Sequence, residues 1–128
     1  MKVIIITGNP KYINVPIARR YYRDIQGHLN SLGVRDVKFN VGEDYTCPPE
    51  ADIYIAHSRG CGRLYRCDNM NVNNTVLLGV PEGIIHPIDL TWHKTWLETK
   101  GLGTPPDTHF LLFKEQRDAI SALVNRHR

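Results

Sequence analysis

The sequence predicts an α/β fold, a three-layer sandwich around a short, mostly parallel central sheet. Short runs of β-branched and other apolar residues are bounded by glycine, proline or asparagine, as expected of buried strands. These runs alternate with a segment whose apolar residues recur at the helical spacing of three and four. Such alternation is typical of a parallel sheet with helices on both faces.

The N-terminal third supplies the clearest strand and the clearest helix. Lys2 to Thr7 is a nearly continuous apolar run that ends at Gly8, so we expect a central parallel strand buried on both faces. Between Val15 and Leu32 the apolar residues follow the helical period, and Gly33 stands where a residue that ends the helix is expected.

Two further strands are predicted before the middle of the chain. Val37 to Val41 alternates apolar and polar residues, which indicates a short, exposed strand at an edge of the sheet, where a homodimer can form. Asp52 to Ala56 is continuously apolar after its first residue and predicts a buried strand. Arg59 to Arg66 is expected to follow it as a helix.

The C-terminal half is less regular. Val76 to Val80 predicts a fourth strand, but after Pro81 the apolar pattern weakens and no further strand is evident. Thr91 to Lys100 is compatible with a short helix. A helix at the C-terminus is indicated by apolar residues at helical spacing, namely Phe113, Ile120, Leu123 and Val124.

Length and charge bear on the number of domains and on the partners of the protein. The chain has 128 residues and no evident linker, so we expect residues 1–128 to form a single domain. The sixteen Lys and Arg residues are scattered along the chain and the net charge is only +3, so we expect no nucleic-acid partner.

The cysteines and the N-terminus bear on the cellular location. Cys47, Cys61 and Cys67 are odd in number and lack C-x-x-C spacing, which argues against a disulfide framework and against a zinc site. A reducing, cytoplasmic location fits them. The N-terminal apolar run is too short for a signal peptide or a membrane span, so we expect no membrane association.

Ser58 follows closely after the strand predicted at 52–56. It lies in the segment Ala-His-Ser-Arg-Gly, two positions after Ala56 and two positions before Gly60, which are both small residues. A strand that passes into a helix through such a turn is the layout of a nucleophile elbow, in which the serine hydroxyl projects above the sheet. The competing interpretation is that Ser58 caps the helix that follows it.

Three segments together resemble the α/β-hydrolase family. Residues 55–64 are similar to its nucleophile segment, residues 75–81 to the strand after it, and residues 109–120 to its histidine loop and final helix. The chain therefore looks like a minimal, single-domain member. The resemblance implies the chain order serine, acid, histidine, and it implies that His57 lines the elbow without transferring protons.

The resemblance also assigns the catalytic base and acid. His109 is the implied base because it follows a loop and precedes the final helix, while His86 and His93 are alternative bases. Asp89 is the implied acid, with Asp107 as the alternative acid. Either aspartate has a competing interpretation as a solvated turn residue.

The remaining site residues concern the oxyanion and the substrate. The backbone N–H of Arg59 is one implied donor to a developing oxyanion, and the loop Gly8-Asn9 after the first strand would supply the other. Trp92, together with Trp96, is expected to form an apolar flap over the acyl group, although both also fit core packing.

The sequence thus predicts a serine hydrolase that acts on an ester, thioester or amide of a small acyl substrate and requires no metal or organic cofactor. Two alternatives remain open. The first is a non-catalytic binding module with the same fold. The second is a nucleotide- or nucleoside-binding α/β protein, for which Arg59, Arg63 and Lys11 would bind the anionic group.

Overall fold

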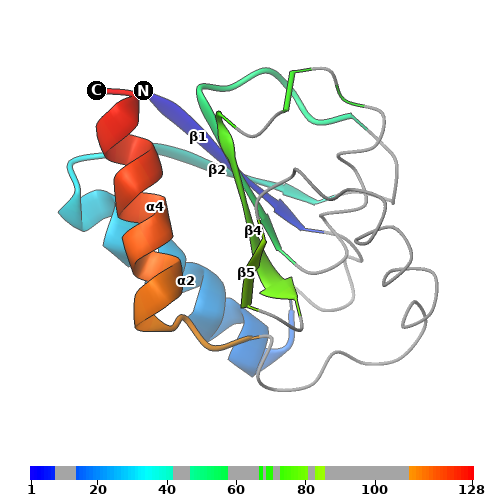
Figure 1. Cartoon of the computed structure of the whole chain (residues 1–128). Coiled ribbons are helices and arrows are strands. Elements are labelled where there is room, and N and C mark those ends of the chain that lie inside the picture. The colour runs from blue at the N-terminus through cyan, green and yellow to red at the C-terminus, as the bar shows by residue number, and fades with distance from the viewer. Residues whose placement is uncertain are drawn as a thin grey trace.

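The computed structural model describes residues 1–7, 14–41, 47–57, 67, 69–70, 73–80, 83–85 and 110–128, with residues 79, 80 and 83–85 described by their backbone alone. Figure 1 shows the described strands and the two described helices. In chain order the elements are β1 (Lys2–Thr7), α2 (Pro16–Ser31), β2 (Asp36–Val41), β3 (Ile53–His57), β4 (Thr75–Val80), β5 (Gly83–Ile85) and α4 (Lys114–Arg126).

The strands form one sheet in the order β2-β1-β3-β4-β5. β1 pairs in parallel with β2 and with β3, β3 pairs in parallel with β4, and β5 pairs with β4 in the antiparallel sense. The predicted α/β fold with a mostly parallel sheet is therefore confirmed. β2 lies at the edge of the sheet and is largely exposed, as its alternating sequence predicts.

Both described helices cover the same face of the sheet (Figure 1). Side chains from alternate positions of β1, β3 and β4 meet α2 and α4 there and form the larger apolar core. Its buried members are Val3, Ile5, Ala18, Tyr21, Tyr22, Ile25, Leu29, Val34, Ile53, Ile55, Val76, Leu78, Phe110, Ile120, Leu123 and Val124.

The opposite face of the sheet has a smaller core. Ile4, Ile6, Tyr54, Ala56 and Leu77 point to this face, where Cys67 and Met70, from the connection between β3 and β4, are buried against them. Cys67 and Met70 therefore lie over the face that α2 and α4 leave uncovered. The helix predicted at 59–66, which would make this a helical layer, lies outside the described residues, as does the one predicted at 91–100.

Gly33 ends α2 as predicted. Its φ of 85° lies in the left-handed region, which glycine enters without steric cost. The N–H of Gly33 donates to the carbonyl of Asn30 at 3.0 Å, and the N–H of Val34 donates to the carbonyl of Leu29 at 3.0 Å. These two bonds are those of a Schellman motif, and Val34 and Leu29 also share the apolar core.

The C-terminal helix differs from the prediction at its first residue. Phe113 is the N-cap of α4 and is 47% exposed, so it does not belong to the buried helical face, whereas Ile120, Leu123 and Val124 do. The side chain of Gln116 accepts a hydrogen bond from the N–H of Phe113 at 3.1 Å. Gln116 thereby supplies the half of a capping box in which the N3 side chain accepts from the N-cap N–H.

β5 is not predicted from the sequence. Gly83–Ile85 is only three residues long, which is too short for the alternation of apolar and polar residues to be recognised. Only two residues separate β5 from β4, and this separation suits an antiparallel neighbour because a parallel one needs a long crossover.

Candidate functional site

The carboxyl ends of β1 and β3 are the natural place for a site in this sheet. The chain leaves β1 toward β2 on one side, and β3 and β4 extend the sheet on the other side. Ligands of open parallel sheets bind at the carboxyl edge where the direction of strand order reverses in this way. β1 ends at Thr7 and β3 ends at His57, and both side chains are buried.

His57 points away from solvent, toward the helices. Its side chain is 1% exposed, and its Nδ1 lies 2.9 Å from the hydroxyl oxygen of Tyr22 in α2. β3 extends one residue further than the sequence analysis predicted, so that His57 is its last residue. The imidazole is consequently fixed by a strand on one side and by a helix on the other.

Aromatic rings surround the imidazole of His57. The ring centroid of Tyr21 lies 4.6 Å from that of His57, the centroid of Tyr22 lies 5.4 Å from it and the centroid of Phe110 lies 5.5 Å from it. Tyr21 also contacts Phe110 edge to face, with centroids 6.2 Å apart. We call Tyr21, Tyr22, His57 and Phe110 the aromatic cluster. It joins α2, β3 and the segment that leads into α4.

The aromatic cluster itself is not exposed to a substrate. With 1% of its surface accessible, His57 cannot contact a substrate in this conformation. The cluster instead packs beneath the carboxyl edge of the sheet.

The predicted site residues themselves fall outside the described part of the chain. They are Gly8, Asn9, Ser58, Arg59, Asp89, Trp92, Asp107 and His109. The structure does describe direct chain neighbours of three of them: Thr7 precedes Gly8, His57 precedes Ser58, and Phe110 follows His109. Of these neighbours, His57 and Phe110 are in contact.

Tyr22 and Phe110 are not among the site residues predicted from the sequence. Tyr21 and Tyr22 were visible only as part of the apolar face of a helix, and Phe110 as part of an apolar segment. One signal was available. Two adjacent tyrosines near the start of the helix after β1 bring hydroxyl groups to the carboxyl edge of the sheet, where polar groups of a site gather.

A second polar cluster surrounds Tyr54, near the opposite end of β3. The hydroxyl of Tyr54 accepts hydrogen bonds from the N–H of Ala51 at 2.7 Å and from the side-chain amide of Asn69 at 2.8 Å, and it donates to the carbonyl of Pro49 at 3.2 Å. Burial raises the pKa of Tyr54 above 10.0, although the bond from Ala51 opposes this shift. This cluster fastens the chain on either side of β3.

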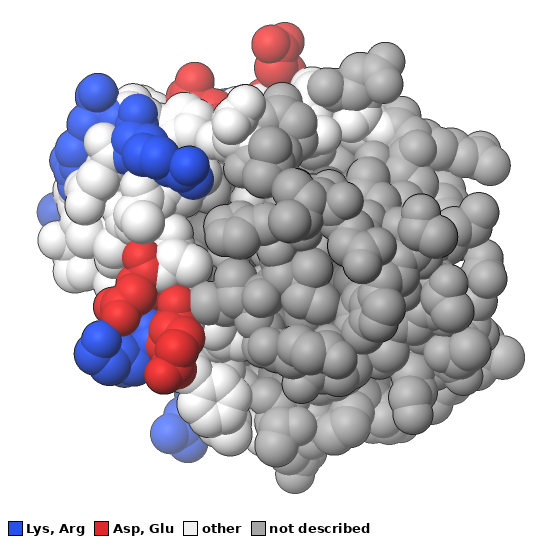
Figure 2. All heavy atoms as spheres, in the orientation of Figure 1, with Lys and Arg blue, Asp and Glu red and all other residues white. Residues whose placement is uncertain are grey.

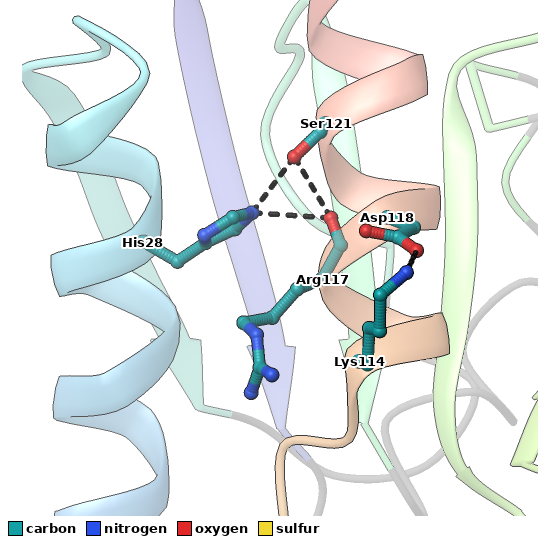
Figure 3. A network of polar contacts seen from close by, with 5 residues as sticks. All are labelled: His28, Lys114, Arg117, Asp118 and Ser121. Atoms are coloured by element: carbon teal, nitrogen blue, oxygen red, sulfur yellow. Dashed lines mark hydrogen bonds and ion pairs between the residues drawn. The ribbon is translucent and has the colours of Figure 1, made fainter.

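A third polar group joins the two helices (Figure 3). The Nε2 atom of His28 in α2 lies 2.9 Å from the hydroxyl of Ser121 and 3.1 Å from the carbonyl oxygen of Arg117, both in α4. A carbonyl oxygen only accepts, so Nε2 carries a proton and donates. Ser121 in turn donates to the carbonyl of Arg117 at 2.9 Å. His28 therefore has no free lone pair at Nε2 with which to activate Ser121 as a nucleophile.

Further features of the described residues concern metal ligands, membrane spans and surface charge. No three His, Cys, Asp or Glu side chains among them gather closely enough to hold a metal ion. Within the same ranges no helix is both long and apolar enough to cross a bilayer. Figure 2 shows basic and acidic side chains side by side on the described part of the visible face, without a field of one sign across it.

Comparison with known proteins returned no relatives: no family model, no curated protein sequence and no solved structure matches this chain.

Proposed function

We propose that this protein is a serine hydrolase of the minimal α/β-hydrolase type, acting on an ester, thioester or amide of a small acyl substrate. Ser58 attacks the carbonyl carbon, and His109 accepts the hydroxyl proton and returns it to the leaving group. Asp89, or Asp107 in its place, holds the imidazole of His109. Water then hydrolyses the acyl-enzyme, again with His109 as the base.

One observation carries this proposal. The rings of His57 and Phe110 are in contact, with centroids 5.5 Å apart, and these two residues are covalently bonded to Ser58 and His109. Consecutive Cα atoms are about 3.8 Å apart, so contact between the neighbours supports an encounter between the proposed nucleophile and base.

The position of β3 in the sheet gives further support. β3 is the middle strand of the five and is parallel to both of its neighbours, β1 and β4. A nucleophile elbow requires such a buried strand directly before the serine. Because β1 lies beside β3 and runs in the same direction, the loop that begins at Gly8 and Asn9 starts at the edge where Ser58 follows β3, as an oxyanion donor should.

The acid gains no support from β5. This strand ends at Ile85, four positions before Asp89, but it runs antiparallel to β4 and therefore leads away from the edge at which Ser58 follows β3. Asp107 lies three positions before Phe110 of the aromatic cluster, so the alternative acid is kept as well. The two cysteines that the structure describes, Cys47 and Cys67, are not joined in a disulfide, which suits the proposed cytoplasmic location.

We further propose that two copies of the protein associate through β2. Phe39 and Val41 at this edge are 36% and 37% exposed. Antiparallel pairing centred on Phe39 would set Val37 opposite Val41 of the second copy, which places apolar side chains in cross-strand pairs.

The experiment that tests the proposed activity is covalent labelling with a fluorophosphonate probe, read by intact mass and peptide mapping. We expect an adduct on Ser58 that is lost in Ser58→Ala and strongly reduced in His109→Ala. His86→Ala and His93→Ala are the matched controls and should label normally. A folded wild-type protein that forms no adduct would contradict hydrolysis, and thermal-shift screening with nucleotides and acyl compounds would then test the two binding functions.

A further inference from the structure

Tyr22 makes a polar contact that the proposed reaction does not yet use. Its hydroxyl oxygen lies 2.9 Å from Nδ1 of His57, and both side chains are buried. The two residues are 35 positions apart in the sequence, so the contact exists because α2 packs against the end of β3. A buried polar pair of this kind is costly to leave unsatisfied.

The position of the Tyr22 hydroxyl is determined by packing. The ring of Tyr22 meets Tyr21 edge to face at 5.6 Å and meets Phe39 of β2 edge to face at 5.8 Å. Tyr22 therefore has aromatic neighbours on its own helix and on the edge strand. A group held in this way by helix and sheet is better fixed than one held by a loop.

From this arrangement we propose that Tyr22 is a positioning residue. Its O–H donates to Nδ1 of His57 and holds the imidazole in the tautomer that carries its proton on Nε2. The oriented imidazole fixes the last residue of β3, to which Ser58 is bonded, and presses against Phe110, to which His109 is bonded. The expected effect of Tyr22 on the reactivity of Ser58 rests on the proposed function. Its expected effect on the orientation and tautomer of His57 does not.

A merely structural role makes a different prediction. If Tyr22 only contributed to stability, its loss would lower the unfolding midpoint without altering the folded protein near residues 58 and 109. Ser121→Ala is a suitable control because it also removes one hydroxyl from a hydrogen bond to a histidine, between α2 and α4. Both variants keep the apolar core, since Tyr22→Phe retains the aromatic ring and Ser121→Ala removes only a hydroxyl group.

The test compares wild type, Tyr22→Phe and Ser121→Ala by ¹⁵N NMR, at a temperature at which all three are folded. We expect the wild-type ring nitrogens of His57 to show a single neutral tautomer, with an unprotonated Nδ1. In Tyr22→Phe these ring shifts should change, and so should the backbone amide signals of Ser58 and His109. In Ser121→Ala they should stay at their wild-type positions. Unchanged amide signals in Tyr22→Phe would overturn the proposal.

Labelling rates with the fluorophosphonate probe then separate this proposal from the proposed function. Displacement of a reacting group by about 1 Å can cost up to about a hundredfold in rate, so we expect Tyr22→Phe to label at least roughly tenfold more slowly than Ser121→Ala. If wild type does not label at all, the hydrolase proposal fails, and the NMR comparison still decides whether Tyr22 positions His57. If wild type labels and Tyr22→Phe labels equally fast, the positioning role is wrong.

Discussion

The imidazole of His57 and the ring of Phe110 pack against each other with their centroids 5.5 Å apart. This contact joins the end of the central strand β3 to the segment that leads into α4, two parts of the chain that are distant in sequence. It lies on the face of the sheet that α2 and α4 cover. The proposed nucleophile and base each stand one residue from this pair, so the contact is the first to test by mutation.

Replacement of Phe110 should affect both stability and labelling. Phe110 is buried, and a buried Phe→Ala substitution costs about 3 to 5 kcal/mol of unfolding free energy. Phe110→Leu keeps an apolar side chain and should cost only about 1 kcal/mol while it removes the ring contact with His57. Urea unfolding measures the first effect, and the fluorophosphonate labelling rate of the folded Leu variant measures the second.

Phe113 supplies the control for Phe110. It belongs to the same segment but is 47% exposed, so Phe113→Ala should change the unfolding free energy by less than about 0.5 kcal/mol and should label at the wild-type rate. Equal losses in the two Ala variants would show that the buried contact has no special role.

The two glycines at the end of α2 should respond to alanine in opposite directions. Gly33 has a φ of 85°, where a side chain costs about 1 to 2 kcal/mol, so Gly33→Ala should be destabilising. Gly27 lies within the helix and a Cβ there would meet no atom within 4 Å, so Gly27→Ala should stabilise by up to about 1 kcal/mol. Urea midpoints with an unchanged slope would report both effects. A stabilising Gly33→Ala would contradict the Schellman motif.

How well the sequence predicted this structure depends on how local each feature is. The helix at 16–31 and the strands at 2–7 and 53–57 are encoded in spacing and apolar runs, and their predicted bounds were close. The Tyr22–His57 bond was not predictable because it depends on how α2 packs on β3, which no local pattern records. β5 was not predicted because three residues are too few to show the alternation of apolar and polar residues that is typical of a strand. Ser58 and His109 stay predictions, supported by their contacting neighbours.

The contact between His28 and Ser121 should couple the two helices energetically. His28→Ala and Ser121→Ala should each lower the unfolding free energy by about 1 kcal/mol. The double variant should lower it by about 0.5 to 1 kcal/mol less than the sum of the two single effects. Lys114→Ala is the control. Its ion pair with Asp118 at 2.7 Å is highly exposed, and its loss should leave the unfolding midpoint unchanged. Strict additivity in the His28 and Ser121 cycle would exclude the coupling.

Tyr54 should make the fold sensitive to alkali. Its pKa is raised above 10.0, chiefly by burial, so the folded state holds the phenol proton where the unfolded state releases it. The contribution of Tyr54 to stability is therefore complete below about pH 10 and is lost as pH rises through the folded pKa. Urea unfolding from about pH 8 to about pH 11 should show this fall in wild type.

Tyr54→Phe separates the ionisation of Tyr54 from its hydrogen bonds. The variant should be less stable than wild type at neutral pH because the N–H of Ala51 and the amide of Asn69 lose their acceptor, a loss of about 1 to 3 kcal/mol. Its stability should nevertheless fall less steeply above about pH 10. Parallel curves for the two proteins would assign the alkaline loss to other groups.

The edge strand β2 provides a test of self-association. Sedimentation equilibrium of the wild type should show a monomer and a dimer in equilibrium, with a dimer fraction that rises with protein concentration. Val41→Lys should be monomeric, because it places a charge in the paired strand, and lysine on an edge strand opposes pairing. Val15→Lys is matched to it in residue type and in exposure, at 39% against 37%, but lies outside β2 and should leave the dimer intact. A wild type that stays monomeric at every concentration, or a dimer equally weakened by both substitutions, would remove β2 as the interface. Retention of the dimer in Val41→Lys would do the same, since two copies paired along this strand would bring two such lysines into one short ladder.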